Sequence, residues 1–253
     1  MFNLISFIFL LIPWVLYPMK TIAHTNPEAE AYISKMLQKQ IPYEVNMLGC
    51  TFKINNVNAY PPGKLSAMFA SYLIDNDLVK HKTVVDAGAG CFALGIISAK
   101  QGAKIAIGLD ISEEAVNCAK ENIANNSVAE NAFVLQSDGL GSLVPKYSGK
   151  VDLLLSGAPW DTLSSEEFDA LPLYRKILSR SFYDVDNKLI ADVLSKGPLL
   201  LSPSGRIFIT ASKRVMPRLE KLFELYKVKY QIVKQEDIHQ DGNIHYIIEI
   251  KPK

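Results

Sequence analysis

Apolar and polar positions follow two repeats along most of the chain, one typical of strands and the other of helices. Seven short apolar runs bounded by turn residues predict strands at 83–86, 104–109, 132–136, 151–156, 206–210, 229–234 and 244–250. Apolar residues at helical spacing predict helices at 65–73, 92–100, 112–125, 164–180, 187–196 and 217–226.

Strands that alternate with helices predict a doubly wound α/β fold with a mostly parallel, seven-stranded sheet. In such folds the ligand site lies at the carboxyl ends of the strands. The strand–turn–strand pair that closes the chain places one antiparallel strand near an edge. A turn of sequence Ser-Pro-Ser-Gly is expected at 202–205, just before the fifth strand.

The region before this alternation is predicted to form a smaller unit. Capping-box spacing between Thr25 and Glu28 predicts a helix over 25–40. Two strand-like stretches follow within 43–60, around a glycine turn. We therefore divide the chain into an apolar segment at 1–18, a helix and strand pair at 25–62, and a main domain at 63–253.

The segment 1–18 contains no charged side chain and is slightly short for a membrane-spanning helix. It lacks the cationic start of a secretory signal, and its first following cation is Lys20. One interpretation is a membrane anchor with the body of the chain in the cytoplasm. Another is a mis-assigned start, with translation from Met19. A cleaved signal or a buried helix is the third.

The overall charge narrows the class of partner. With 27 basic and 26 acidic side chains the net charge is +1, which argues against binding to nucleic acid through the overall field. The three cysteines and four histidines are scattered, in no metal-ligand spacing, so we predict no metal site. Sparse cysteines favour a reducing, cytoplasmic compartment.

A glycine-rich turn between the first two main-domain strands is the strongest candidate site. Gly88 and Gly90 follow the strand that ends at Asp86, and Asp110 ends the next strand about 20 residues later. Glycines there allow a ligand to approach the backbone, and the acid is placed for two ribose hydroxyls. This pattern fits both the dinucleotide fingerprint and an S-adenosylmethionine site.

Asp86 favours the second alternative. Dinucleotide-binding proteins usually keep an aliphatic residue at this position, because a carboxylate would repel the pyrophosphate at short range. The same carboxylate complements a ligand that carries an ammonium and a sulfonium. A turn or capping role for Asp86 is the structural alternative.

The strings Val84-Val-Asp-Ala-Gly-Ala-Gly90, Gly108 to Asn122 and Ser137-Asp138 resemble class I S-adenosylmethionine-dependent methyltransferases. The branch most similar is the small-domain group that includes the protein-glutamine N5-methyltransferases, over residues 41–250. The resemblance implies that the cofactor is S-adenosylmethionine. The residues implied around it are Asp86, Gly88 and Gly90 at the methionine part, Asp110 at the ribose, and Ile111, Asp138 and Gly139 at the adenine. Asp138 could instead be a turn residue.

The fourth main-domain strand ends in Ser156-Gly-Ala-Pro159-Trp160-Asp161, where the glutamine-modifying relatives have Asn-Pro-Pro-Tyr. Gly157 replaces the Asn and removes a side-chain acceptor. We predict acceptor-site roles for Ser156, Pro159, Trp160 and Asp161, with Trp160 as a wall and Asp161 as acceptor or base. Core and turn roles are the alternatives for Trp160 and Asp161.

The resemblance implies methyl transfer to a protein side chain or a small molecule, with an altered acceptor. The insert that follows Trp160 is rich in apolar and aromatic residues, which suits such acceptors better than RNA or DNA. Phe92 departs from the family, which often has glycine there, and its ring could narrow the cofactor pocket. A non-catalytic binding protein, an RNA methyltransferase and an oxidoreductase are the alternatives.

Overall fold

The computed structural model describes residues 33–36, 38–157, 159, 161–179 and 181–251 of the chain. The interpretations of 1–18 and of most of the predicted helix 25–40 lie outside these residues, although 33–36 are helical. Within the described part of the chain, no helix is both long and apolar enough to cross a membrane.

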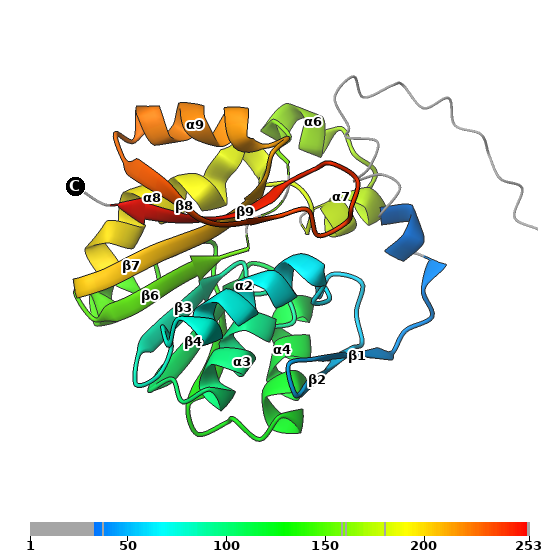
Figure 1. The fold of residues 1–253 in the computed structure, drawn as a ribbon. Coiled ribbons are helices and arrows are strands. Elements are labelled where there is room, and N and C mark those ends of the chain that lie inside the picture. Colours follow the sequence, from blue (N-terminus) through cyan, green and yellow to red (C-terminus); the bar gives the residue numbers. More distant parts are fainter. Residues whose placement is uncertain (1–32, 37, 158, 160, 180, 252–253) are drawn as a thin grey trace, which may run out of the picture.

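A seven-stranded sheet runs through the molecule in the order β5–β4–β3–β6–β7–β9–β8 (Figure 1). The strands are β3 (Thr83–Ala87), β4 (Ile105–Asp110), β5 (Ala132–Gln136), β6 (Val151–Ser156), β7 (Leu201–Ser212), β8 (Lys229–Glu236) and β9 (His245–Lys251). Neighbours from β5 to β7 pair in parallel, and β9 pairs antiparallel with both β7 and β8. The predicted fold class, with an antiparallel strand near one edge, is confirmed.

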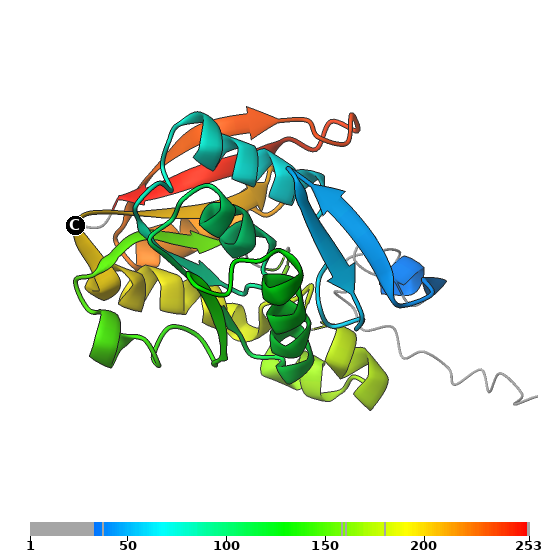
Figure 2. The same cartoon turned by 90° about the horizontal axis from the view of Figure 1, so that it is seen from below.

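Helices cover both faces of the sheet (Figures 1 and 2). Their bounds are α2 (Lys64–Asp75), α3 (Ala93–Lys100), α4 (Glu113–Asn125), α5 (Val144–Tyr147), α6 (Ser165–Asp169), α7 (Leu173–Ser179), η1 (Val185–Asn187), α8 (Lys188–Leu200) and α9 (Met216–Leu225). Successive strand residues point to opposite faces. Val84 therefore packs in the cluster of α2, α3 and α4, whereas Val85 packs in the cluster of α8 and α9.

A two-stranded hairpin, β1 (Tyr43–Met47) and β2 (Cys50–Ile54), lies beside α4 (Figure 2). Two asparagines of α4 fasten β2 through its backbone. The Lys53 N–H donates to Asn122 Oδ1 at 2.8 Å, and the Thr51 N–H donates to Asn126 Oδ1 at 3.1 Å. Both asparagines are buried, so these bonds replace solvation that the edge of β2 has lost. The hairpin thus fixes the segment 55–62 at the edge of the sheet.

Two predicted elements differ in the structure. The helix expected over 164–180 is divided into α6 and α7, because Pro172 lacks the N–H needed to continue the first helix. The turn expected at 202–205 lies within β7 as an irregularity. Val151 pairs with Leu201 but Leu153 pairs with Arg206, so the intervening residues bulge out of the ladder.

Phe92 occupies a position that a side chain rarely takes. It precedes α3 in the left-handed conformation, with φ 65° and ψ 35°, yet its side chain is fully buried. The ring fills the space above two glycines, since a Cβ on Gly95 or on Gly108 would overlap it. Phe92 is absent from the residues that line the cavity at the carboxyl ends of β3, β4 and β6. The hypothesis that its ring narrows the cofactor pocket is therefore wrong, because the ring packs into the core.

Truncating Phe92 is expected to destabilise the fold. Phe92→Ala should lower the free energy of unfolding by about 3–5 kcal/mol, because it removes a buried ring and leaves a cavity. Phe92→Gly should lower the free energy of unfolding by about 1 kcal/mol less than Phe92→Ala does, since glycine adopts a positive φ without strain. Urea denaturation of the wild type and both variants measures this order. Equal stability of all three proteins would contradict the core role.

Candidate functional site

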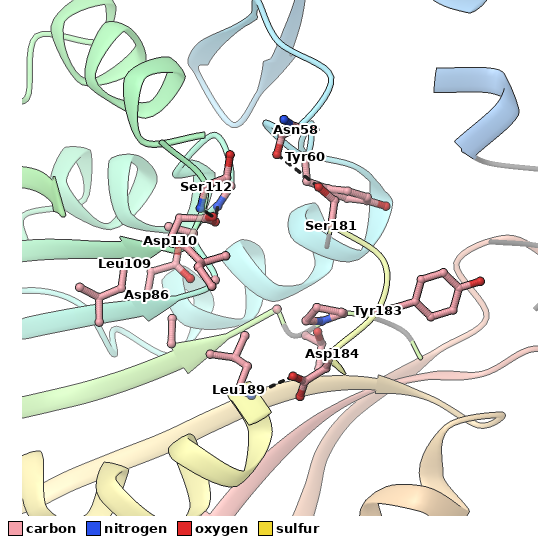
Figure 3. Close-up of a pocket in the computed structure, with 18 of the residues that line it drawn as sticks. Asn58, Tyr60, Asp86, Leu109, Asp110, Ser112, Ser181, Tyr183, Asp184 and Leu189 are labelled. Carbon is pink, nitrogen blue, oxygen red and sulfur yellow. Dashed lines mark hydrogen bonds between the residues drawn. The ribbon is translucent and has the colours of Figure 1, made fainter. Parts of the chain in front are cut away.

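A cavity of about 630 Å³ opens at the carboxyl ends of β3, β4 and β6. Figure 3 shows Asp86 and Asp110 on one side of it, with Tyr183, Asp184 and Leu189 on another. The cavity lies where an open α/β sheet is expected to bind its ligand. The cavity is lined by residues from the strand ends on one side and from the insert that follows β6 on another.

Asp110 is held in place by backbone donors from two loops. Its Oδ2 accepts from the Gly90 N–H at 2.8 Å, and its Oδ1 accepts from the Ser112 N–H at 2.9 Å. A carboxylate has about four acceptor positions, so acceptor capacity remains for further donors. Burial raises the pKa of Asp110, and the bonds from Ser112 and Gly90 oppose that shift.

Asp86 lies at the end of β3 and is almost completely buried. Burial first, and then the nearby charge of Asp110, raise its pKa to about 7, against the opposing effect of the Gly95 N–H. A buried carboxyl group, Asp86, and a half-buried one, Asp110, therefore share one wall of the cavity, and the charge of Asp110 disfavours ionisation of Asp86. A cation that entered the cavity would relieve this repulsion.

The glycine turn brings bare backbone to the cavity. Gly88 has φ 76° and Gly90 has φ 55°, a region that favours glycine. A Cβ on Gly90 would lie 3.3 Å from the Tyr60 carbonyl oxygen, and one on Gly88 would lie 3.0 Å from Leu189 Cδ2. Side chains at these positions would fill the approach to the turn from opposite sides.

The wall predicted for the adenine carries an ion pair. Ile111, Asp138 and Gly139 all line the cavity, and Asp138 pairs with Lys188 of α8. Gly139 has φ 80°, and a Cβ there would overlap the carboxylate of Asp192. That carboxylate also accepts from the Leu140 N–H at 2.6 Å. The start of α8 thus closes this side of the cavity.

The four residues predicted for the acceptor site are divided by the structure. Pro159 lines the cavity, together with Gly157. Ser156 is fully buried and donates through Oγ to the Ala87 carbonyl at 2.9 Å, so it ties the ends of β6 and β3 together and does not line the cavity. Asp161 also lies outside the lining, where its Oδ1 accepts from the N–H of Thr162. Trp160 is outside the described residues.

Several cavity residues were not singled out from the sequence. Asn58 and Tyr60 come from the segment after β2, and Asp184 comes from the loop before η1. Asp184 is buried and accepts from the N–H groups of Leu189 and Ile190 at 2.8 and 3.0 Å. Burial raises its pKa, and these backbone bonds oppose the shift. Asp184 precedes the helix predicted at 187–196, and this position of an acid before a helix is the sequence feature that could have indicated it.

The residues present fit S-adenosylmethionine. The donor set suits it, because Asp86 and Asp110 offer acidic groups to its cationic and hydroxyl parts, and the glycine turn leaves room at the backbone. A buried acceptor also lacks a partner here: among the described residues nothing hydrogen-bonds to Asn58 Oδ1, on the same cavity. A ligand that donates hydrogen bonds would satisfy it.

Comparison of the sequence with known proteins identifies methyltransferases. The sequence model of the family "Ribosomal protein L11 methyltransferase (PrmA)" matches residues 69–156. A putative protein N5-glutamine methyltransferase of Methanocaldococcus jannaschii is 34% identical over 139 residues, which cover 51% of this chain and 66% of that protein. The ribosomal protein L11 methyltransferase of Lactobacillus johnsonii is 36% identical over 40% of this chain and 30% of its own length. The chain thus spans less than two thirds of these relatives.

Solved structures share the fold at lower identity. The ribosomal protein L11 methylase of Lactobacillus delbrueckii subsp. bulgaricus superposes with a TM-score of 0.52 at 21% identity, over 79% of this chain and 84% of that one. The tRNA m1G37 methyltransferase of Methanocaldococcus jannaschii gives a TM-score of 0.58 at 16% identity, over 85% of this chain and 58% of that one. In sequence and fold the chain resembles methyltransferases, which confirms the class of enzyme and the fold that its motifs predicted.

Proposed function

We propose that this protein transfers a methyl group from S-adenosylmethionine to a protein side chain or a small organic molecule. The observation that carries the proposal is the position of Asp110, which closes the glycine turn through the Gly90 N–H and still faces the cavity. S-adenosylmethionine would supply an activated methyl group. The chain's own residues then have to bind the cofactor, orient the acceptor and exclude water.

Cofactor binding is assigned to the carboxyl ends of β3 and β4. Asp110 accepts the ribose hydroxyls with the lone pairs that Gly90 and Ser112 leave unused. Asp86 faces the cationic end of the cofactor, and Gly88 and Gly90 leave the backbone open to it. Ile111, Asp138 and Gly139 form the adenine wall. Asn58 Oδ1 adds one acceptor that the sequence motifs did not include.

Acceptor binding is assigned to the turn after β6. Pro159 and the backbone of Gly157 form its described part, and Trp160 is the proposed ring that flanks the acceptor. Ser156 is a positioning residue, because its hydroxyl holds β6 against Ala87. Asp161 lies outside the cavity lining and accepts from the Thr162 N–H, so the role of acceptor or base predicted for it is not carried into this proposal. Since Gly157 offers no side-chain acceptor, we propose an acceptor other than the glutamine amide of the related enzymes.

The charge around the cavity favours a protein or small-molecule acceptor over RNA. Three lysines line the cavity: Lys64, Lys188 and Lys196. Seven aspartates line it: Asp86, Asp110, Asp138, Asp169, Asp184, Asp186 and Asp192. An excess of aspartates over lysines in the lining disfavours a phosphate backbone, and this effect weakens with salt.

Isothermal titration of the full chain with S-adenosylmethionine, S-adenosylhomocysteine and NAD tests the proposal. Binding of the first two and not of NAD is expected. A screen of peptides and metabolites for methyl transfer then separates the enzyme from the alternative, a methyltransferase-fold protein that binds a partner without catalysis. Preference for NAD would refute the proposal.

Asp110→Asn is expected to weaken cofactor binding by about 1–3 kcal/mol, because the amide offers the ribose hydroxyls one acceptor oxygen in place of two. Glu113→Gln is the matched control. Glu113 is an exposed acid at the start of α4, three residues after Asp110, and it does not line the cavity. Calorimetric titration of both variants measures the effect. Unchanged affinity in Asp110→Asn would remove Asp110 from the cofactor site.

Asp86 is expected to make cofactor affinity and apo stability depend oppositely on pH. Because the folded-state pKa is raised to about 7 from 3.8, its favourable contribution to folding is full below about pH 4 and is lost as pH rises through about 7. Asp86→Asn should therefore be more stable than wild type at pH 8, with the difference vanishing toward pH 4. Thermal melts across this range measure it.

The same ionisation favours a cationic ligand. Wild-type affinity for S-adenosylmethionine should fall as pH drops below about 7, whereas Asp86→Asn should bind more weakly at pH 8 and lose this dependence. S-adenosylhomocysteine, which has no sulfonium, should show a smaller dependence. Parallel pH profiles in both proteins would contradict the role given to Asp86.

Trp160→Ala is expected to slow methyl transfer on the order of 100-fold while sparing cofactor affinity, because about 1 Å of acceptor misplacement has that effect. If Trp160 were only core, the change would instead lower stability by about 3–5 kcal/mol. Melting temperature, cofactor affinity and turnover measured on one preparation distinguish these outcomes. Normal turnover per folded molecule would exclude the acceptor-wall role.

A further inference from the structure

A second, smaller chamber of about 260 Å³ adjoins the main cavity. Four residues line both hollows: Leu65, Pro159, Thr210 and His239. The chamber is otherwise built from the carboxyl end of β7, the first turns of α9, and the loop between β8 and β9, which reaches toward the cavity end of the sheet (Figure 1). It therefore begins at the turn after β6 that we assign to the acceptor.

The chamber and the main cavity have opposite charge character. Two arginines and two imidazoles stand among apolar residues in the chamber wall: Arg214, Arg218, His239 and His245. Asp241 is its one acidic lining residue. The main cavity, in contrast, is lined by seven aspartates and three lysines. A small ligand with an anionic end and a neutral end would therefore orient itself across the two hollows.

Two buried nitrogen atoms of the chamber lack hydrogen-bond partners. In the part of the chain that the structure describes, nothing accepts from Arg218 Nε, and His245 Nδ1 makes no hydrogen bond of normal geometry, although the Asn243 backbone interacts with the imidazole. His245 is only 7% exposed, so water at the surface does not solvate its ring freely. Unsatisfied buried polar atoms cost free energy, and a bound group that pairs with them recovers it.

Arg218 is already held in a fixed orientation by its neighbours. One terminal nitrogen, Nη1, donates to Asn187 Oδ1 at 3.0 Å. Burial lowers the pKa of Arg218, and the nearby carboxylates of Asp184 and Asp161 oppose the shift. The guanidinium stays cationic, because arginine does not lose its proton in proteins. A fixed, charged N–H donor suits an oxyanion better than a neutral group.

We propose that this chamber binds a compact oxyanion, a carboxylate or a phosphate, on a small organic methyl acceptor. Arg218 Nε donates to the anion, and His245 supplies the second polar contact. The volume suits a short acid and not a polymer. The aspartates of the adjoining main cavity disfavour a polyanion that extends into it, so the pair of hollows suits small anions. The anion site stands on these contacts alone; its link to a methyl acceptor rests on the proposed function.

NMR of the ¹⁵N-labelled full chain tests the anion site without any methyl transfer. The probes are succinate, its neutral counterpart succinamide, and inorganic phosphate. Succinate or phosphate is expected to give saturable shifts of the Arg218 Nε–H and His245 ring signals, and succinamide none. Binding of succinate assigns the group as a carboxylate, and binding of phosphate alone assigns it as a phosphate. No saturable shift with either anion would overturn the proposal.

Matched variants separate a specific contact from general charge. Arg218→Lys keeps the cation but loses the fixed Nε donor, and should weaken anion binding about tenfold or more. His245→Gln should weaken it as well and serves as a second variant should Arg218→Lys melt early. Lys213→Gln removes one exposed charge that does not line the chamber and should leave binding unchanged. Equal weakening by Lys213→Gln and Arg218→Lys would overturn the proposal.

A titration with S-adenosylhomocysteine on the same preparation keeps the two proposals apart. Cofactor binding without anion binding refutes the chamber assignment alone. Anion binding without cofactor binding refutes the proposed function and leaves the anion site standing. With both present, an acid and its carboxamide compared as methyl acceptors give the final result. Methylation of the carboxamide at the rate of the acid would break the link between chamber and acceptor.

Discussion

The site depends on one pair of hydrogen bonds, those that the Asp110 carboxylate accepts from the N–H groups of Gly90 and Ser112. They join the loops after β3 and β4 through a single side chain, which fixes the two loops relative to each other on this side of the cavity. Bonds from backbone donors to a carboxylate are charge-assisted and short. They also offset part of the cost of burying the acid, which leaves the remaining lone pairs of Asp110 for a ligand.

This arrangement places Asp86, which is almost completely buried, beside Asp110. Asp86 has no backbone bonds of comparable number, and burial together with the charge of Asp110 raises its pKa to about 7. The fold therefore tolerates an acid whose ionised form is disfavoured by burial and by its neighbour, at a cost to stability when it ionises. Perturbed carboxyl groups are enriched at functional sites, where a charged ligand compensates the cost. The raised pKa values of Asp86 and Asp110 at the ends of β3 and β4 are consistent with a cationic ligand and not with a pyrophosphate.

The strands and the glycine turn could be predicted because their signals are local. Buried runs such as 151–156 and the spacing from Asp86 to Asp110 carry their meaning in the sequence itself. The far wall could not be predicted in the same way. Tyr60 and Asp184 reach the cavity only because the hairpin is fastened to α4 and because the insert folds back onto the strand ends. Phe92 could not be placed from the sequence either. Its position in the motif predicted a ring in the cofactor pocket, but Gly95 of α3 and Gly108 of β4 leave a space in the core that the ring fills.

The two hollows solve a selection problem that one cavity could not. A site acidic enough for a cationic cofactor repels every anion that approaches it, including small acids that are useful acceptors. Arg218 and His245 line the adjoining chamber and not the main cavity, so a small anion has a separate wall to bind to. Salt screens the electrostatic field of the exposed aspartates over about 8 Å at physiological ionic strength. A compact anion fits within the chamber beside its arginines, whereas a chain of phosphates would also lie along the aspartates of the main cavity. Specificity here arises from repulsion at the entrance as much as from attraction inside.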